Sequence, residues 1–289
     1  MWIAWLKLMR VPLVLTAVAD SLTGYFITRP AVEGLYGVPP LLALLSALLY
    51  SGGMVINDVE DHLRDKKIHP ERPIPSGLVT RNQALIFAGI LLFPTILIGF
   101  AISTQTLVVT MILIALTYTY NHVFKQYRIP GSLNMGLLRF FNFALGMSAN
   151  LEFSEMTVKL MVLPGILLAY VALLTMISTM EEAESKREEV MILALLQIFV
   201  VLGANMFLDS ITAILFSLVL AGALAYKAGQ VWKDCTTDRI RDMVLWSLMG
   251  IVVIDGMIAL GQEHRFMALI LLFGFLPATW GWVKLFRHV

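Results

Sequence analysis

The sequence predicts an all-α membrane protein, a bundle of nine or ten transmembrane helices around a central cavity. Of the 289 residues, 58% are hydrophobic and only 14% are charged, whereas soluble domains carry about 25% charged residues. The mean hydropathy of +0.81 points the same way. The apolar residues gather in runs long enough, or nearly so, to cross a bilayer. None of these runs alternates with a period of two, which disfavours a β-barrel.

Each expected helix corresponds to one apolar run, taken in order from the N-terminus. Backbone amides inside lipid must bond within their own segment, so each run is predicted to be a helix. No linker separates the runs, and residues 1–289 are predicted to form a single domain. We expect ten spans, at residues 11–28, 38–56, 82–101, 106–121, 131–150, 160–179, 190–207, 210–226, 242–261 and 266–283.

Charge and cysteine content exclude several other classes of protein. The formal net charge is +1, which argues against nucleic-acid binding, because nucleic-acid-binding proteins carry a basic patch and a high pI. Cys235 is the single cysteine, so neither a disulfide framework nor a cysteine metal site can form within one chain. The partner that composition predicts is the lipid bilayer.

The basic residues predict the orientation in the membrane. If the N-terminus is cytoplasmic, 17 of the 21 Lys and Arg residues fall in inside segments and three fall outside, with Arg139 within a span. This bias follows the positive-inside rule and predicts an even number of spans with both termini cytoplasmic. The loops at 57–81 and 180–189 then lie on the same cytoplasmic face.

Four polar residues at the end of the second span are candidate metal ligands: Asn57, Asp58, Asp61 and Asp65. If the helix continues past the membrane, the three carboxylates come at i, i+3 and i+7 and share one face. Such carboxylates repel one another unless a cation lies between them, and oxygen ligands suit Mg²⁺. Arg64, Lys66, Lys67 and Arg72 follow and could neutralise bound phosphates.

The alternative is a solvated loop that happens to be charged. Against it, the run Arg72-Pro73-Ile74-Pro75-Ser76-Gly77 follows directly, and its two prolines fix a rigid, non-helical return to the membrane. The combination favours a built diphosphate site.

Asn57-Asp58-x-x-Asp61-x-x-x-Asp65, followed by Glu71 and the Arg72–Gly77 run, resembles the first signature of the UbiA superfamily of prenyltransferases. The resemblance implies a helical membrane enzyme, usually of nine spans. Such an enzyme binds an allylic prenyl diphosphate through Mg²⁺ and passes the prenyl group to an acceptor, often aromatic. It implies catalytic roles for Asp58, Asp61 and Asp65.

Further segments extend the resemblance over about residues 7–190. The run 7–10 is similar to the family's opening, with Val11 where a proline is usual, and 118–121 with Lys125 resembles its tyrosine and lysine region. The run 134–139, with Asn142 and Gly146, and the run 16–20 resemble the EboC-like branch. The substrate-binding candidates are Arg10, Asn57, Arg72, Tyr118, Tyr120, Lys125, Asn134 and Asn142.

The second family signature should follow the sixth span, where this chain has glutamates in place of aspartates. Glu181, Glu182 and Glu184 are candidate ligands for a second Mg²⁺, and Glu181 and Glu184 share a helical face at i and i+3. The alternative is an ordinary charged loop.

Asp20, Arg139 and Asp255 lie within apolar spans, where a charge is costly unless it faces the bundle interior. Arg139 is a candidate catalytic residue that meets the diphosphate or the acceptor; alternatively, it pairs structurally with Asp20 or Asp255. Tyr118 or Tyr120 could stabilise an allylic cation with its ring face.

The predicted function is Mg²⁺-dependent prenyl transfer from a prenyl diphosphate to an unidentified acceptor. A membrane transporter would also explain ten spans and the intramembrane charges. A catalytically lapsed family member acting as a scaffold would explain the altered second signature.

Overall fold

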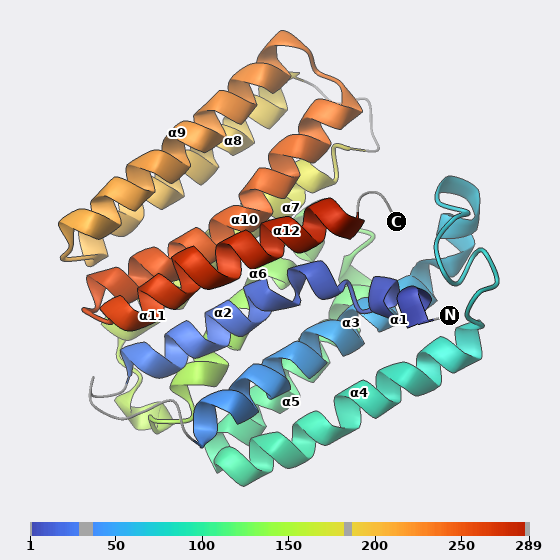
Figure 1. Ribbon diagram of the computed structural model, residues 1–289, viewed down its shortest axis with the longest axis horizontal. Coiled ribbons are helices and arrows are strands. Elements are labelled where there is room, and N and C mark those ends of the chain that lie inside the picture. The colour runs from blue at the N-terminus through green and yellow to red at the C-terminus, as the bar shows by residue number, and fades with distance from the viewer. Residues whose placement is uncertain (1, 29–36, 182–186, 287–289) are drawn as a thin grey trace.

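The computed structural model describes residues 2–28, 37–181 and 187–286, and every regular element in that part of the chain is a helix. All ten expected segments are helical, and the predicted fold class is confirmed (Figure 1). The elements are α1 (Trp2–Leu8), α2 (Val11–Ile27), α3 (Val38–Ile68), α4 (Arg81–Ile102), α5 (Thr104–Thr119), the π-helix η1 (Tyr120–Phe124), α6 (Arg128–Met147), the 3₁₀ turn η2 (Phe153–Glu155), α7 (Val158–Ser178), α8 (Arg187–Gly203), the 3₁₀ turn η3 (Ala204–Phe207), α9 (Ile211–Lys233), α10 (Thr237–Gly261), α11 (Arg265–Leu269), the π-helix η4 (Ile270–Phe275) and α12 (Leu276–Phe286).

Length and apolarity identify eight helices of the described chain as membrane spans, and α1 with α2, bent by 44°, would make a ninth. The tenth long helix is α6, whose 20 residues are enough to cross the hydrocarbon core at about 1.5 Å each. Helix α6 does not meet the same criterion of apolarity because it carries Asn134, Arg139 and Asn142. All three of these side chains are buried inside the bundle.

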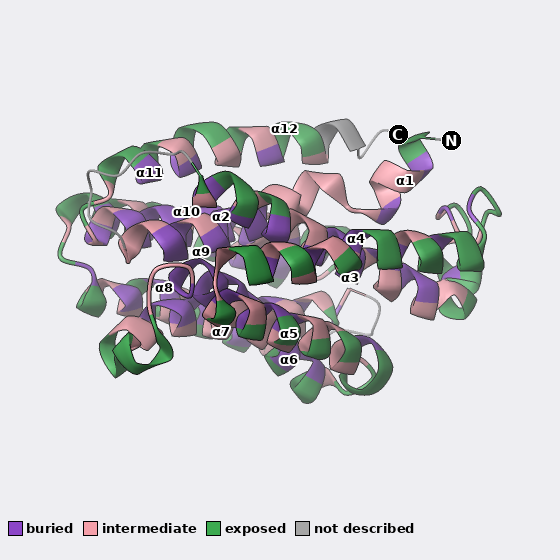
Figure 2. Cartoon of the chain, turned by 90° about the horizontal axis from the view of Figure 1, so that it is seen from below, coloured by how far each residue is buried: buried purple, intermediate pink, exposed green. Residues whose placement is uncertain are grey.

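Figure 1 shows the helices lying side by side, with α4 and α5 at one edge of the bundle and α8 and α9 at the other. The outward surfaces of these edge helices carry large apolar side chains, including Phe93, Phe199 and Val219, which are 65%, 79% and 70% exposed. Figure 2 shows such exposed positions along the outside of the bundle, whereas buried positions face the middle. This is the polarity expected of a surface in contact with lipid tails.

Helix α3 positions the acidic motif. Its 31 residues rise about 46 Å, well beyond a hydrocarbon core of about 30 Å. The helix continues beyond the expected span 38–56, through Asp58, Asp61 and Asp65, and ends at Ile68. The condition under which the three carboxylates share one face is therefore met. We call this end of the bundle, where α3 ends and α4 begins, the motif end.

The centre of the bundle depends on a close crossing of α2 and α6. A Cβ added at Gly24 would lie 2.0 Å from the carbonyl oxygen of Phe143, and one added at Gly146 would lie 1.8 Å from that of Ser21. Only glycine permits the two backbones to approach this closely. The crossing brings Asp20 on α2 beside Arg139 on α6.

Candidate functional site

A cavity of about 350 Å³ opens between α2, α3, α5, α6, α7 and α10. Its apolar wall comes from several helices and includes Leu49, Leu113, Leu174 and Leu248. Six of the residues predicted from sequence line it: Arg10, Asn57, Tyr120, Arg139, Asn142 and Glu181. The cavity is therefore apolar over most of its surface, with a small number of polar groups on its walls, as ligand sites usually are.

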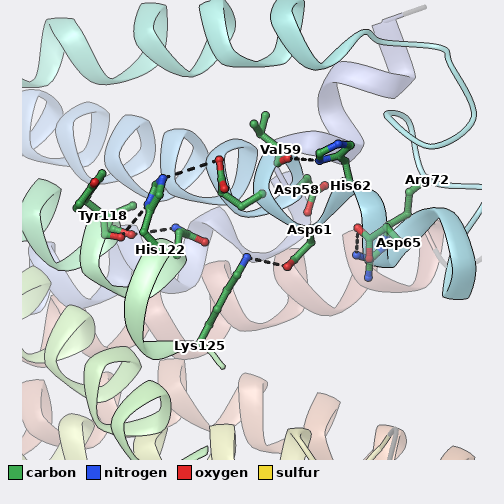
Figure 3. Close-up of polar contacts among 12 residues, drawn as sticks. Asp58, Val59, Asp61, His62, Asp65, Arg72, Tyr118, His122 and Lys125 are labelled. Carbon is green, nitrogen blue, oxygen red and sulfur yellow. Dashed lines mark hydrogen bonds and ion pairs between the residues drawn. The ribbon is translucent and has the colours of Figure 1, made fainter. Parts of the chain in front are cut away.

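The three aspartates of α3 each pair with a separate base at the motif end, and Figure 3 shows the pairs made by Asp61 and Asp65. The pairs are Asp58 with Arg10 (3.4 Å), Asp61 with Lys125 (2.7 Å) and Asp65 with Arg72 (2.6 Å). The bases come from three places in the chain, and each offsets part of the repulsion among the carboxylates. Within the described residues no three His, Cys, Asp or Glu side chains converge on one point.

Local backbone structure places two of these bases. Arg10 lies between α1 and α2 with φ 48°, a left-handed conformation uncommon for a non-glycine residue. This conformation turns the chain by 44° and brings the guanidinium toward Asp58. After α3, the amide of Ser76 donates to the carbonyl of Arg72 (2.9 Å), and Gly77 has φ 78°. The proline-containing run thus makes the compact return that the sequence predicted.

The oxygen groups near the cavity fit Mg²⁺. Asn57 lines the cavity, and Asp61 lies one turn further along the same face of α3. Glu181 lines the cavity from the end of α7 and lies 3.6 Å from Arg241. A convergent carboxylate cage is not required, because Mg²⁺ takes only one or two protein carboxylates and completes its shell with water and substrate phosphates. Glu182 and Glu184 lie outside the described residues.

Arg139 occupies the deeper part of the cavity wall. Its Nη1 donates to Oδ2 of Asp20 (2.9 Å) and its Nη2 to Oγ1 of Thr16 (2.8 Å). The Nδ2 of Asn142 donates to the same Asp20 oxygen (3.2 Å) and to the carbonyl of Ala17 (2.7 Å). Arg139 therefore pairs with Asp20 and also lines the cavity, and its contact with the diphosphate or the acceptor stays a prediction.

Four substrate-binding candidates are not part of the cavity lining: Arg72 and Lys125, which pair with aspartates, and Tyr118 and Asn134. Tyr118 is 59% exposed and stacks on His122, with ring centroids 4.2 Å apart. Asn134 is buried and donates to Oγ1 of Thr119 (3.1 Å). The roles of all four residues in binding stay predictions.

Sequence reasoning missed several lining residues. Ser46 and Tyr50 face the cavity from α3, four residues apart and on the same side of the helix as the predicted Asn57, and the ring of Tyr50 lies 5.7 Å from the guanidinium of Arg139. This helical spacing was readable in the sequence. The wall contributed by Val244, Leu248 and Ile251 of α10 carries no comparable signal, because apolar residues surround the whole helix.

Comparison with known proteins places the chain in a family. The family model that matches is the UbiA prenyltransferase family, over residues 17–189. The chain belongs to the UbiA prenyltransferase family. The residues matched include the acidic run on α3 and the polar face of α6. Placement in the EboC-like branch stays a prediction.

Curated relatives match part of the chain. One is a digeranylgeranylglyceryl phosphate synthase of Sulfolobus acidocaldarius, 33% identical over 135 residues, which covers 46% of this chain and 48% of that protein. The chain thus spans about half the length of the curated relative it matches.

Solved structures match over a greater length. A UbiA homolog from Archaeoglobus fulgidus aligns with a TM-score of 0.66 over 91% of this chain and 99% of that one, at 13% identity. A structure of a UbiA homolog from the same organism, bound to GPP and Mg²⁺, gives a TM-score of 0.61 at 14% identity, covering 89% of this chain and 99% of that one. At this identity the alignments show a shared fold.

Proposed function

We propose that this protein catalyses Mg²⁺-dependent transfer of a prenyl group from an allylic prenyl diphosphate to an acceptor within the membrane. The observation that carries the proposal is the cavity itself. It joins Asn57 and Glu181 near the motif end to a deep apolar wall, which matches a substrate with a charged head and a hydrocarbon tail. Family membership and the solved relative bound to GPP and Mg²⁺ support the same chemistry.

Asn57, Asp58, Asp61 and Asp65 are the residues proposed to hold the ion, with Glu181 as the candidate for a second one. Mg²⁺, when bound, neutralises the diphosphate and so makes it a better leaving group. Asp61 is now paired with Lys125, so we expect the lysine to move to a phosphate oxygen when substrate binds. We likewise expect Arg10 to move from Asp58, and Arg72 from Asp65, to phosphate oxygens when substrate binds.

The remaining chemistry falls to the walls of the cavity. Breaking the C–O bond leaves an allylic cation, which needs protection from water, and the apolar side chains of six helices supply it. The ring of Tyr120 lines the cavity and can stabilise positive charge through its face. Arg139 is proposed to contact the diphosphate or the acceptor. The acceptor attacks the cation and then loses a proton.

The proposed orientation follows from the basic residues. Both termini, the motif end and the loop after α7 are proposed to lie on the cytoplasmic side, which the distribution of Lys and Arg supports. Water-soluble prenyl diphosphates would then reach the site from the cytoplasm.

Binding of prenyl diphosphates tests the proposal. The purified chain in detergent with Mg²⁺ would be titrated with geranyl, farnesyl and geranylgeranyl diphosphates, and turnover followed with candidate acceptors. Geranylgeranyl diphosphate is the first donor to try, because the curated relatives are named for a product with geranylgeranyl groups. We expect Mg²⁺-dependent binding that Asp61→Asn weakens by at least about tenfold, the usual effect of losing a group next to a metal.

The matched control is Asp209→Asn, the same chemical change at an exposed residue between η3 and α9, at the opposite end of the bundle. It should bind like the unaltered chain. Mg²⁺-dependent binding that survives Asp61→Asn unchanged would refute the proposed site. Failure to bind any prenyl diphosphate would favour a transporter, and binding without turnover would favour a lapsed scaffold.

A further inference from the structure

Asp255 on α10 is a buried carboxyl group that the proposed reaction does not use. It lies beyond residues 17–189, to which the family model is matched. Its side chain is fully buried, and neither of its carboxyl oxygens has a hydrogen-bond partner among the described residues. Oδ1 of Asp20 on α2, the helix against which α10 packs, is likewise buried without a partner. The other oxygen of Asp20, Oδ2, accepts from Arg139. Asp255 lies close enough to Asp20 and Arg139 to interact electrostatically with both.

The hydrogen-bond donors around Asp20 and Asp255 indicate that one of the two carboxyl groups carries a proton. Oδ2 of Asp20 accepts from Arg139 (2.9 Å) and from Asn142 (3.2 Å), which is the environment of an ionised carboxylate. Counted as ionised groups, Oδ1 of Asp20 and both oxygens of Asp255 have no donor among the described residues. An ionised carboxylate only accepts hydrogen bonds, so two of them cannot bond to each other. One proton on the pair removes the conflict.

Asp255 is the member of the pair that carries this proton. Asp20 already receives two donors, one of them a cation, whereas no described donor reaches Asp255. With Asp255 neutral, the group comprises one guanidinium and one carboxylate and has no net charge. With Asp255 ionised, an unpaired negative charge would be buried among membrane helices, which is costly.

We propose that Asp255 is a neutral carboxylic acid that donates a hydrogen bond to Oδ1 of Asp20 and thereby positions Arg139 at the wall of the cavity. Asp20 is then fixed from both sides, by Arg139 and Asn142 on α6 and by Asp255 on α10. Arg139 cannot turn toward a second partner without breaking its bonds to Asp20 and Thr16. The C-terminal helix α10 thus contributes to the site through a proton as well as through its apolar wall.

Infrared difference spectroscopy tests the proton directly. At neutral pH the unaltered chain should show the C=O stretch of a protonated carboxyl group, shifted by exchange into D₂O. Asp255→Asn should remove that band, whereas Glu263→Gln, outside the pair and beyond the end of α10, should leave it. A spectrum that does not change on Asp255→Asn would overturn the inference, whatever the activity of the protein.

Two further variants test the positioning role, which rests on the proposed function for its kinetic readout. The amide of Asp255→Asn can still donate to Asp20 without charge, so kcat should stay close to that of the unaltered chain. The leucine of Asp255→Leu cannot donate a hydrogen bond to Asp20. We therefore expect kcat to fall on the order of 10- to 100-fold, because Arg139 is then misplaced. Mg²⁺-dependent binding of geranylgeranyl diphosphate should change little. Equal loss in both variants, or none in either, would refute positioning.

If the chain transfers no prenyl group at all, a double-mutant cycle replaces the kinetic readout. Asp255→Leu and Arg139→Gln should be non-additive in the unfolding temperature, because Asp20 links the two residues. Additive effects would contradict the linkage, and the infrared result would still decide the location of the proton. Failure of the proposed function and failure of this inference are therefore distinguishable.

Discussion

Replacing Gly146 with alanine tests whether the crossing of α2 and α6 sets the geometry of the site. The added Cβ would lie 1.8 Å from the carbonyl oxygen of Ser21 and 2.6 Å from the amide nitrogen of Tyr25. Both are backbone atoms, so no rotamer change can relieve the clash. The helices must separate by more than about 1 Å before ordinary van der Waals contact returns.

The cost follows from two contributions. Overpacking of a close contact costs about 1–3 kcal/mol, and this contact is at the upper end because only backbone can yield. Separation of the helices also stretches the hydrogen bond from Asn142 to the carbonyl of Ala17, now 2.7 Å, and a lost hydrogen bond adds about 1 kcal/mol. We therefore expect a destabilisation of about 3–4 kcal/mol.

The unfolding temperature in detergent measures the destabilisation. The rate of prenyl transfer shows whether separation of the helices also displaces Arg139. The control is Gly165→Ala on α7, where an added Cβ meets nothing within 4 Å. That change should stabilise the helix by about 0.5–1 kcal/mol, because alanine loses less conformational entropy than glycine. A Gly146→Ala variant that unfolds at or above the temperature of the unaltered chain, with full activity, would refute the reasoning.

Three other outcomes are expected from the same geometry. Arg139→Lys should lower kcat at least about tenfold in a steady-state assay, since an ammonium group cannot reproduce the planar fork that bonds Asp20 and Thr16 together; unchanged kcat would contradict this. Tyr120→Leu should slow transfer by up to about 30-fold, the value of a desolvated cation–π contact, while Tyr120→Phe and Tyr118→Leu should not. Removal of Mg²⁺ with EDTA should abolish transfer and its re-addition restore it, which a transfer assay shows directly; transfer that persists in EDTA would exclude the proposed role of the ion.

Local properties of the chain account for what could be predicted. The apolar runs predicted the helices because a segment in lipid must bond its own backbone. The spacing of Asp58, Asp61 and Asp65 indicated one shared face if the helix continued past the membrane, and α3 does continue as far as Ile68. The prolines after Arg72 predicted the compact return to α4, because they restrict the backbone within a few residues.

Contacts between distant segments could not be predicted in the same way. Tyr118 and Tyr120 differ by about 200° around a helix, so at most one can face the cavity, and local sequence does not indicate which. The bases that pair with the aspartates come from three other segments, and the partner of Asp58 lies 48 residues earlier in the chain. The sequence predicted carboxylates gathered around a cation, whereas the structure has each carboxylate bound to its own base.

Hydropathy and helical period are properties of neighbouring residues, so the amino-acid sequence alone indicated the helices and the acidic motif at the end of the second one. The folded arrangement was needed to show which side chains form the cavity, and that Asp20 on α2 bonds Arg139 on α6 while Asp255 is buried on α10, which packs against α2. The rotation and crossing of the helices set those contacts. They depend on close approaches such as that of Gly24 and Gly146, whose partners lie more than 100 residues away in sequence.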